Sequence, residues 1–103
     1  MVIIETPIFT EDLLKCLSDD EYREFQQALI ANPKKGELIK GSGGLRKIRW
    51  KQSHKRKRGG LRIIYWWEKS INQITLIFIY KKTDQEDLTP HQIKILKSLI
   101  KGK

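Results

Sequence analysis

The sequence predicts an α+β domain in which helices cover one face of an antiparallel sheet. Three observations favour this fold class. The chain has 103 residues, 39% of them hydrophobic, which is enough for one modest core. Helical spacing of apolar residues occurs towards its two ends, and the segment between them has the two-residue period of strands. We expect residues 1–103 to form a single domain.

The first third of the chain is expected to form a short strand and two helices. Residues 2–4 are a β-branched run that predicts the strand. Thr10 is the expected N-cap of the first helix, which continues to Leu17. Ser18 and Glu21 have the spacing of a capping box, which begins the second helix, and a proline stops that helix.

Residues 45–81 are expected to form most of the sheet. They follow a glycine-rich turn, and in residues 45–51 cationic and apolar side chains alternate. Residues 61–67 form the next β-prone segment after a basic loop, so the two strands should pair as a long hairpin. Residues 73–81 are the most apolar segment, which favours the centre of the sheet.

A last helix is expected to begin at Thr89 and Pro90. Threonine can cap the first backbone donors, and proline suits the first helical position. Ile93, Leu96 and Ile100 then give the helix one apolar stripe. The predicted order of elements is a strand, two helices, a run of strands and a helix, as in small α+β domains.

The net charge of +9 is distributed unevenly. No acidic residue occurs between Glu37 and Glu68, and aromatic residues lie among the cations there. The ten cations of this stretch are Lys40, Arg46, Lys47, Arg49, Lys51, Lys55, Arg56, Lys57, Arg58 and Arg62. Cations that neutralise a polyanion gain affinity by releasing its counterions. The segregation therefore favours a nucleic-acid partner over a charge run that is merely solvated.

Several classes of protein are excluded by composition. The single cysteine, Cys16, cannot form an intramolecular disulfide, and no apolar run approaches the length of a membrane span. The N-terminus has no basic segment before its short apolar run, unlike a secretory signal. We therefore expect a cytoplasmic protein without membrane contact. The basic stretch lacks clustered carboxylates or Cys/His sets, so we expect neither a metal nor another cofactor.

An RNase can work without a metal, because the 2′-hydroxyl beside the scissile phosphate is a built-in nucleophile. Fixed cations then stabilise the charge that grows on the phosphate. The cations able to converge on one phosphate are Lys47, Arg49, Arg62 and Lys82. The alternative is that these are ordinary solvent-facing sheet residues. His54, in the basic loop, is a candidate general base, an RNA contact, or neither.

Three segments resemble toxins of the RelE superfamily, most closely its HigB-type branch. They are GGLRKIR (residues 43–49), KRGGLRIIY (residues 57–65) and IFIYKK (residues 77–82). The resemblance implies a RelE-like fold and a metal-independent endoribonuclease that cuts messenger RNA in the A site of the 70S ribosome. It also implies inhibition by a cognate, HigA-like antitoxin.

The same resemblance implies roles for individual residues. Lys47 and Arg49 would act in place of a conventional acid/base pair, and Arg62 would stabilise the transition-state phosphate. Lys82 matches a basic residue at the end of the last strand. The family's C-terminal tyrosine, which stacks on the substrate base, is matched by Leu88, so stacking must come from another residue or be absent.

Further RNA contacts are expected from the remaining cations and one aromatic residue. They are Arg46, Lys51, Lys55, Arg56, Lys57, Arg58 and Tyr80. Trp50 is the other aromatic candidate, although a core role suits it better. Two alternative functions remain: a non-catalytic module that only grips RNA or the ribosome, and a ParE-like inhibitor of DNA gyrase. ParE-type toxins generally lack the catalytic cations, which favours the ribonuclease.

Overall fold

The computed structural model describes residues 1–51 and 60–101, and within these ranges it has five strands, three α-helices and one 3₁₀ turn. In chain order they are β1 (Val2–Glu5), α1 (Pro7–Cys16), α2 (Asp19–Ala31), β2 (Glu37–Leu38), β3 (Leu45–Trp50), β4 (Leu61–Glu68), η1 (Lys69–Ile71), β5 (Gln73–Lys81) and α3 (Pro90–Lys101). This order confirms the predicted sequence of elements.

The sheet has the strand order β1-β5-β4-β3-β2. β3 and β4 form the predicted antiparallel hairpin, from Leu45 opposite Trp66 to Trp50 opposite Leu61. The sheet is mixed, because β1 pairs with β5 in parallel. Such a pairing requires a long connection, and two helices and three strands separate β1 from β5 along the chain. The α+β fold class is confirmed, with one pairing that the sequence analysis did not anticipate.

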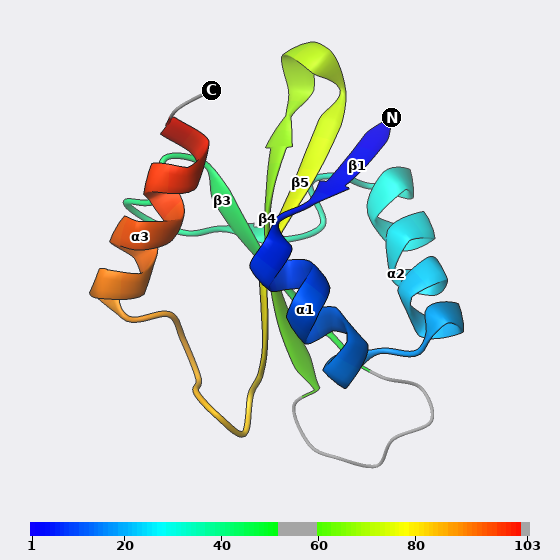
Figure 1. Ribbon diagram of the computed structural model, residues 1–103. Helices are drawn as coiled ribbons and strands as arrows, with labels where there is room; N and C mark the ends of the chain where they lie inside the picture. Colours follow the sequence, from blue (N-terminus) through cyan, green and yellow to red (C-terminus); the bar gives the residue numbers. More distant parts are fainter. Residues whose placement is uncertain (52–59, 102–103) are drawn as a thin grey trace.

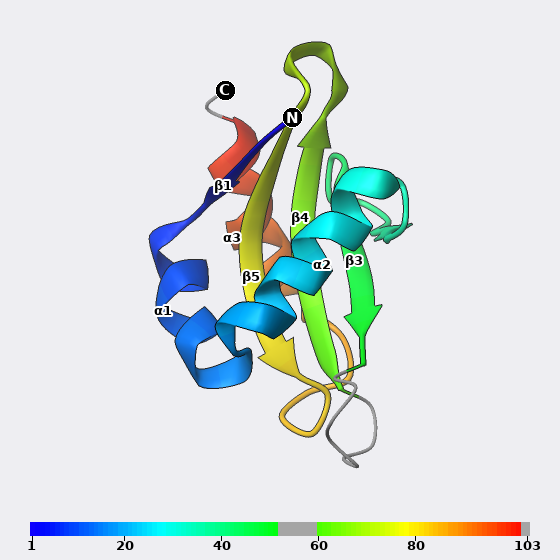
Figure 2. The same ribbon diagram turned by 90° about the vertical axis from the view of Figure 1, so that its right-hand side faces the viewer.

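The helices cover both faces of the sheet, so the expectation that they share one face is wrong (Figure 1). α1 and α2 pack on one face around a core that includes Phe9, Phe25 and Tyr65. α3 packs on the other face with a second core that includes Ile64 and Leu96. Figure 2 shows α2 in front of the sheet and α3 behind it. β4 and β5 have apolar side chains on both faces, and each face therefore needs a cover.

The start of α1 lies earlier than predicted. The helix begins at Pro7, because Thr6 and not Thr10 is its N-cap. The Thr6 Oγ1 accepts a hydrogen bond from the Phe9 N–H at 3.2 Å and donates one to the Ile77 carbonyl of β5 at 2.8 Å. The cap thus ties α1 to the sheet. The Thr-Pro pair that correctly predicted α3 also occurs here, and it is the better start signal.

Capping boxes fix the other two helices. In α2, the Glu21 N–H donates to Ser18 Oγ and the Ser18 N–H donates to Glu21 Oε1, as predicted. In α3, the Gln92 N–H donates to Thr89 Oγ1 at 3.1 Å and the Thr89 N–H donates to Gln92 Oε1 at 2.9 Å. The second box fixes one end of the linker between β5 and α3, residues 82–89.

Candidate nucleic-acid interface

A row of side chains crosses the sheet on the face that α3 covers, here the α3 face. Arg49 of β3 lies opposite Arg62 of β4, and Arg62 lies opposite Tyr80 of β5. Residues directly opposite in a sheet share a face, with Cβ atoms about 4.5–5.5 Å apart. Lys47, two residues before Arg49, points to the same face. The structure therefore brings together Lys47, Arg49, Arg62 and Tyr80, which we call the cationic row.

The two arginines of the row differ in burial. Arg49 is exposed, whereas Arg62 is only 3% exposed. The Nη1 of Arg62 lies 3.5 Å from the Leu61 carbonyl oxygen, within its own strand. Electrostatic interactions are stronger in the low-dielectric interior than in water. An anion that reaches Arg62 would therefore be held more strongly than one at Arg49, which water screens.

Asp87 faces the row from the linker. Its Oδ1 lies 2.5 Å from the Lys47 Nζ, and the Lys47 side chain is 17% exposed. The hydrogen bond from Lys47 and the Lys47 charge hold the pKa of Asp87 below its usual value, and the charges of Arg49 and Arg62 lower it further. Asp87 is therefore ionised at neutral pH. Its negative charge acts on the three cations of the row together.

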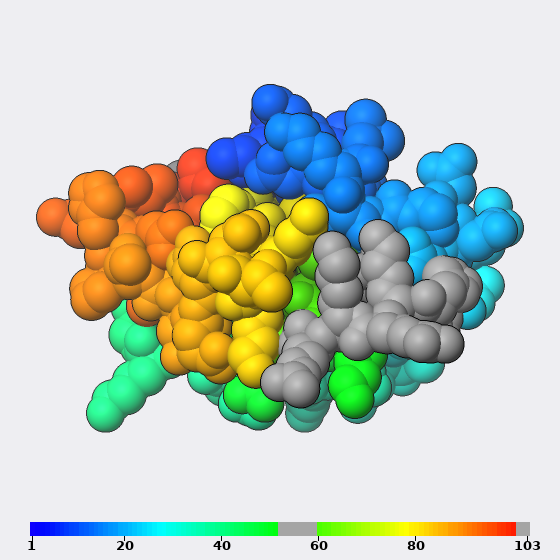
Figure 3. Space-filling view, turned by 90° about the horizontal axis from the view of Figure 1, so that it is seen from below, coloured from blue at the N-terminus to red at the C-terminus, as the bar shows by residue number. Residues whose placement is uncertain are grey.

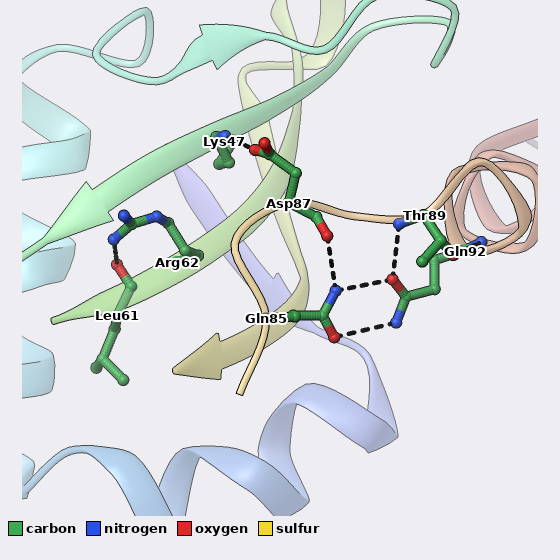
Figure 4. A network of polar contacts seen from close by, with 7 residues as sticks. All are labelled: Lys47, Leu61, Arg62, Gln85, Asp87, Thr89 and Gln92. Carbon is green, nitrogen blue, oxygen red and sulfur yellow. Dashed lines mark hydrogen bonds and ion pairs between the residues drawn. The ribbon is translucent and has the colours of Figure 1, made fainter. Parts of the chain in front are cut away.

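Hydrogen bonds hold the linker against the start of α3 (Figure 4). The Gln85 Nε2 donates to the Asp87 carbonyl at 3.0 Å, and the side-chain amides of Gln85 and Gln92 exchange hydrogen bonds of 2.9 and 3.3 Å. Gln92 also belongs to the capping box of α3. In Figure 3 the linker, coloured yellow to orange, forms part of the molecular surface next to α3. Asp87 is thus carried by an ordered surface segment.

Tyr80 lies at the buried end of the row. Its side chain is 6% exposed, and within residues 1–51 and 60–101 its hydroxyl has no hydrogen-bond partner. Burial raises the pKa of Tyr80, as do the charges of Asp87 and Glu86, while the Arg62 charge lowers it. The ring contributes to the α3-face core, so it does not present a stacking surface to solvent. An RNA contact of Tyr80 stays a prediction and would involve its hydroxyl.

A shallow pocket of about 260 Å³ adjoins the row. Its lining consists of Ile39, Lys40, Lys47, Asp87, Leu88 and Ile93. Leu88, the position matched to the family tyrosine, is half-buried there. The ion pair of Lys47 and Asp87 therefore borders both the cationic row and a recess with apolar and charged lining residues.

The other predicted site residues differ in their positions. Arg46 points to the opposite face, where its Nη1 donates to the Gly36 carbonyl at 2.8 Å. Lys51 and Lys82 are exposed, just beyond the ends of β3 and β5. Of these three cations only Arg46 is turned away from the row, and the roles of Lys51 and Lys82 stay predictions. Predictions for His54, Lys55, Arg56, Lys57 and Arg58 fall outside the described residues.

Trp50 is a core residue, as the sequence analysis favoured over a role in stacking on RNA. It is half-buried and packs edge-on against Phe25 of α2, with ring centroids 5.3 Å apart. It lies on the face that α1 and α2 cover, away from the cationic row. The structure therefore gives no support to Trp50 as a stacking residue.

Sequence reasoning missed Asp87. No role is predicted from the sequence for the acidic residues that follow the last strand, Asp84, Glu86 and Asp87. A usable signal was present, because three carboxylates follow a central strand closely in a chain of net charge +9. Their proximity to the cationic row depends on the path of the linker, which the local sequence pattern does not predict.

Metal-site clusters and membrane-spanning helices are both absent from the described part of the chain. No cluster of three or more His, Cys, Asp or Glu side chains has the arrangement of a metal site there. None of the helices in that part is long and apolar enough to cross a membrane.

The fold is similar to solved structures of the RelE type, although no family model matches the chain. A chain of the intact E. coli RelBE toxin-antitoxin complex matches with a TM-score of 0.59 and 13% identity, over 78% of this chain and 94% of that chain. The free E. coli toxin RelE, as an arginine-to-alanine double mutant, matches with a TM-score of 0.57 and 16% identity, over 82% and 86% of the two chains. The HigB-type branch stays a prediction. The protein has the RelE fold.

Proposed function

We propose that the protein is a toxin of a toxin-antitoxin system and acts as a metal-independent endoribonuclease on messenger RNA in the ribosomal A site. The observation that supports this most is the cationic row. Lys47 and Arg49 from one strand and Arg62 from the next share one face of a RelE-type sheet. The reaction requires cations that contact the same RNA phosphate, and these three side chains could do so together.

The proposed reaction uses the substrate's own nucleophile. The 2′-oxygen attacks the phosphorus, the bond to the 5′-oxygen breaks, and a 2′,3′-cyclic phosphate and a 5′-hydroxyl form. A proton leaves the 2′-hydroxyl and another reaches the 5′-oxygen. Arg62 contributes a planar pair of donors for the phosphate oxygens, whose charge grows in the transition state. Lys47 and Arg49 orient the phosphate and stabilise the same charge.

The RNA chain would be held by charge outside the row. Lys51 and Lys82 are exposed near the same ends of the strands, and four further cations occur at residues 55–58 of the sequence. Contacts of this kind to the phosphate backbone give affinity without sequence preference. Codon register would then come from the ribosome, which presents the message to the toxin.

We further propose a partner protein. The RelBE structure contains a toxin together with its antitoxin, and this chain shares the fold of a chain in that complex. A toxin that acts on its host's own messages needs such an inhibitor, and a net charge of +9 favours an acidic binding segment. Co-expression with products of neighbouring genes, followed by size-exclusion chromatography, tests this. A stable complex with one of them is expected, and its absence would count against the toxin proposal.

Primer extension on a translated message, with and without the protein, tests the proposed activity. We expect cuts in register with codons that disappear when translation initiation is blocked. Ribosome binding without cuts would favour the non-catalytic binder. Inhibition of gyrase in a supercoiling assay, again without cuts, would favour the ParE-like function.

A further inference from the structure

We propose that Asp87 occupies the phosphate position of the cationic row in the free protein, so that the linker of residues 82–89 restrains RNA binding. The inference deepens the proposed function and rests on it, because the competing anion is taken to be an RNA phosphate. It concerns Asp87, a residue to which the resemblance assigns no role.

The contact itself is the first support. A carboxylate oxygen of Asp87 lies 2.5 Å from the Lys47 ammonium, the distance of a charge-assisted hydrogen bond. Lys47 is one of the cations that the proposed reaction assigns to the phosphate. A carboxylate and a phosphate present the same kind of acceptor oxygen to an ammonium, so the two compete for Lys47. The Asp87 charge also acts on Arg49 and Arg62, as the lowered pKa of Asp87 shows.

The second support is the way in which the linker is held. Gln85 donates to the Asp87 carbonyl and shares two hydrogen bonds with Gln92, which caps α3 (Figure 4). These bonds place the Asp87 carboxylate opposite Lys47. Every partner in this set is a side chain or a linker carbonyl. Two linker N–H groups also donate to the Lys81 carbonyl at the end of β5, at 3.0 and 3.3 Å, so the first part of the linker is fixed to the sheet. The Asp87 carboxylate has no backbone partner in β4 or β5 within residues 1–51 and 60–101, so it can move away from Lys47 while the sheet and its register remain intact.

The third support is the low solvent exposure of Arg62 and Tyr80 in the cationic row while Asp87 contacts Lys47. Arg62 is 3% exposed and Tyr80 6% exposed, so neither presents its polar end to bulk solvent. The proposed reaction needs a phosphate to reach Arg62. Movement of Asp87 away from Lys47 frees the ammonium and removes a negative charge from the neighbourhood of both arginines. An incoming phosphate would thus replace an internal anion.

The test compares two variants that lose one negative charge from the same linker. Asp87→Asn removes the carboxylate that faces Lys47. Asp84→Asn is the matched control, because Asp84 is exposed and forms no ion pair within residues 1–51 and 60–101. The probe is a fluorescein-labelled RNA hexamer with 2′-O-methyl groups at every position, which cannot be cut by 2′-oxygen attack. Its affinity is measured by fluorescence anisotropy at one fixed ionic strength.

We expect Asp87→Asn to bind the hexamer roughly two- to fivefold more tightly than wild type, the range that an exposed ion pair supports. Asp84→Asn should gain less. In a Lys47→Met background most of the gain from Asp87→Asn should disappear, because the two residues would act through one contact. Equal affinities of wild type and Asp87→Asn, weaker binding by Asp87→Asn, or an equal gain in Asp84→Asn would overturn the inference.

This outcome is independent of the test of cleavage. The hexamer is uncleavable and no ribosome is present, so a catalytic failure cannot alter the affinity ratio. If Asp87→Asn binds more tightly but wild type makes no cuts on ribosomes, the proposed activity fails and the competition at Lys47 stands. If wild type cuts and Asp87→Asn gains no affinity, only the competition fails.

Discussion

The two faces of the sheet use the same kinds of residue for different purposes. On the face covered by α1 and α2, Arg46 donates to the Gly36 carbonyl, and the Tyr65 hydroxyl donates to the Pro33 carbonyl and accepts from the Gly36 N–H. These groups fix the turn that follows α2. On the α3 face, Arg49 is exposed, and Arg62 and Tyr80 meet the charge of the Asp87 carboxylate on the linker. The first face is a structural network, and the second is arranged around an exchangeable anion.

The difference shows that residue type does not identify a functional cation in this fold. Arg46 and Arg49 are three residues apart on β3 and carry the same charge, yet among the described residues backbone carbonyls engage only the first. What separates them is the face of the strand and the acceptors available there.

The largest effect is expected from Arg62→Ala. Loss of a preorganised donor to a developing oxyanion typically costs roughly 2.7–4 kcal/mol, a hundred- to thousandfold in rate. Arg62→Lys keeps the charge but loses the planar fork, so it should recover only part of the rate. Single-turnover cleavage on ribosomes measures both variants. Because Arg62 is buried, a thermal unfolding curve must first show that each variant is folded at the assay temperature. Wild-type cleavage by folded Arg62→Ala would refute its catalytic role.

A smaller effect, on ribosome affinity, is expected when cations of the basic segment between β3 and β4 are replaced. Replacing Lys55, Arg56, Lys57 and Arg58 by Gln removes four of the cations predicted to hold RNA. Affinity for ribosomes should fall by at least about tenfold near physiological salt, and the dependence of log affinity on log salt should become shallower. Filter binding across a salt titration measures this. An affinity that does not change with salt in the wild type would contradict electrostatic docking.

On the face covered by α1 and α2, a substitution should lower the stability of the fold without changing the cleavage rate. Tyr65→Phe removes both hydrogen bonds of the hydroxyl and leaves the Gly36 N–H without its acceptor. The free energy of unfolding should fall by about 1–3 kcal/mol. Urea denaturation measures the loss, and the cleavage rate of the folded fraction should not change. A lower cleavage rate at full folding would show that the two faces are coupled.

The smallest effect concerns the titration of Asp87. Its pKa is lower in the folded protein, so the Lys47 contact contributes above the ordinary pKa of an aspartate and is lost as pH falls through the lowered value. Carbon-detected NMR of the Asp87 carboxyl should show a midpoint below the ordinary one, and Lys47→Met should raise it. An unchanged midpoint in Lys47→Met would mean that Lys47 is not the main cause.

The sequence predicted the fold class, the β3–β4 hairpin and the shared face of Lys47, Arg49 and Arg62. These follow from local patterns, since strand alternation places Lys47 and Arg49 on one face and the glycine-flanked hairpin sets Arg62 opposite Arg49. The sequence did not predict the placement of α3 on the opposite face, the burial of Arg62, or the approach of Asp87 to Lys47. Those features depend on packing between segments distant in the chain, which local periodicity does not encode.

The most direct test of the account compares Arg49→Ala with Arg46→Ala in the same cleavage and unfolding assays. Both variants lose one arginine from β3, so their net charges are equal. Arg49→Ala should cut ribosome-bound message at least about tenfold more slowly at an unchanged unfolding temperature, because an exposed side chain contributes little to stability. Arg46→Ala should unfold at a lower temperature and, while folded, cut at the wild-type rate. Equal losses of cleavage in the two variants, or a loss confined to Arg46→Ala, would contradict the assignment of the reaction to the α3 face.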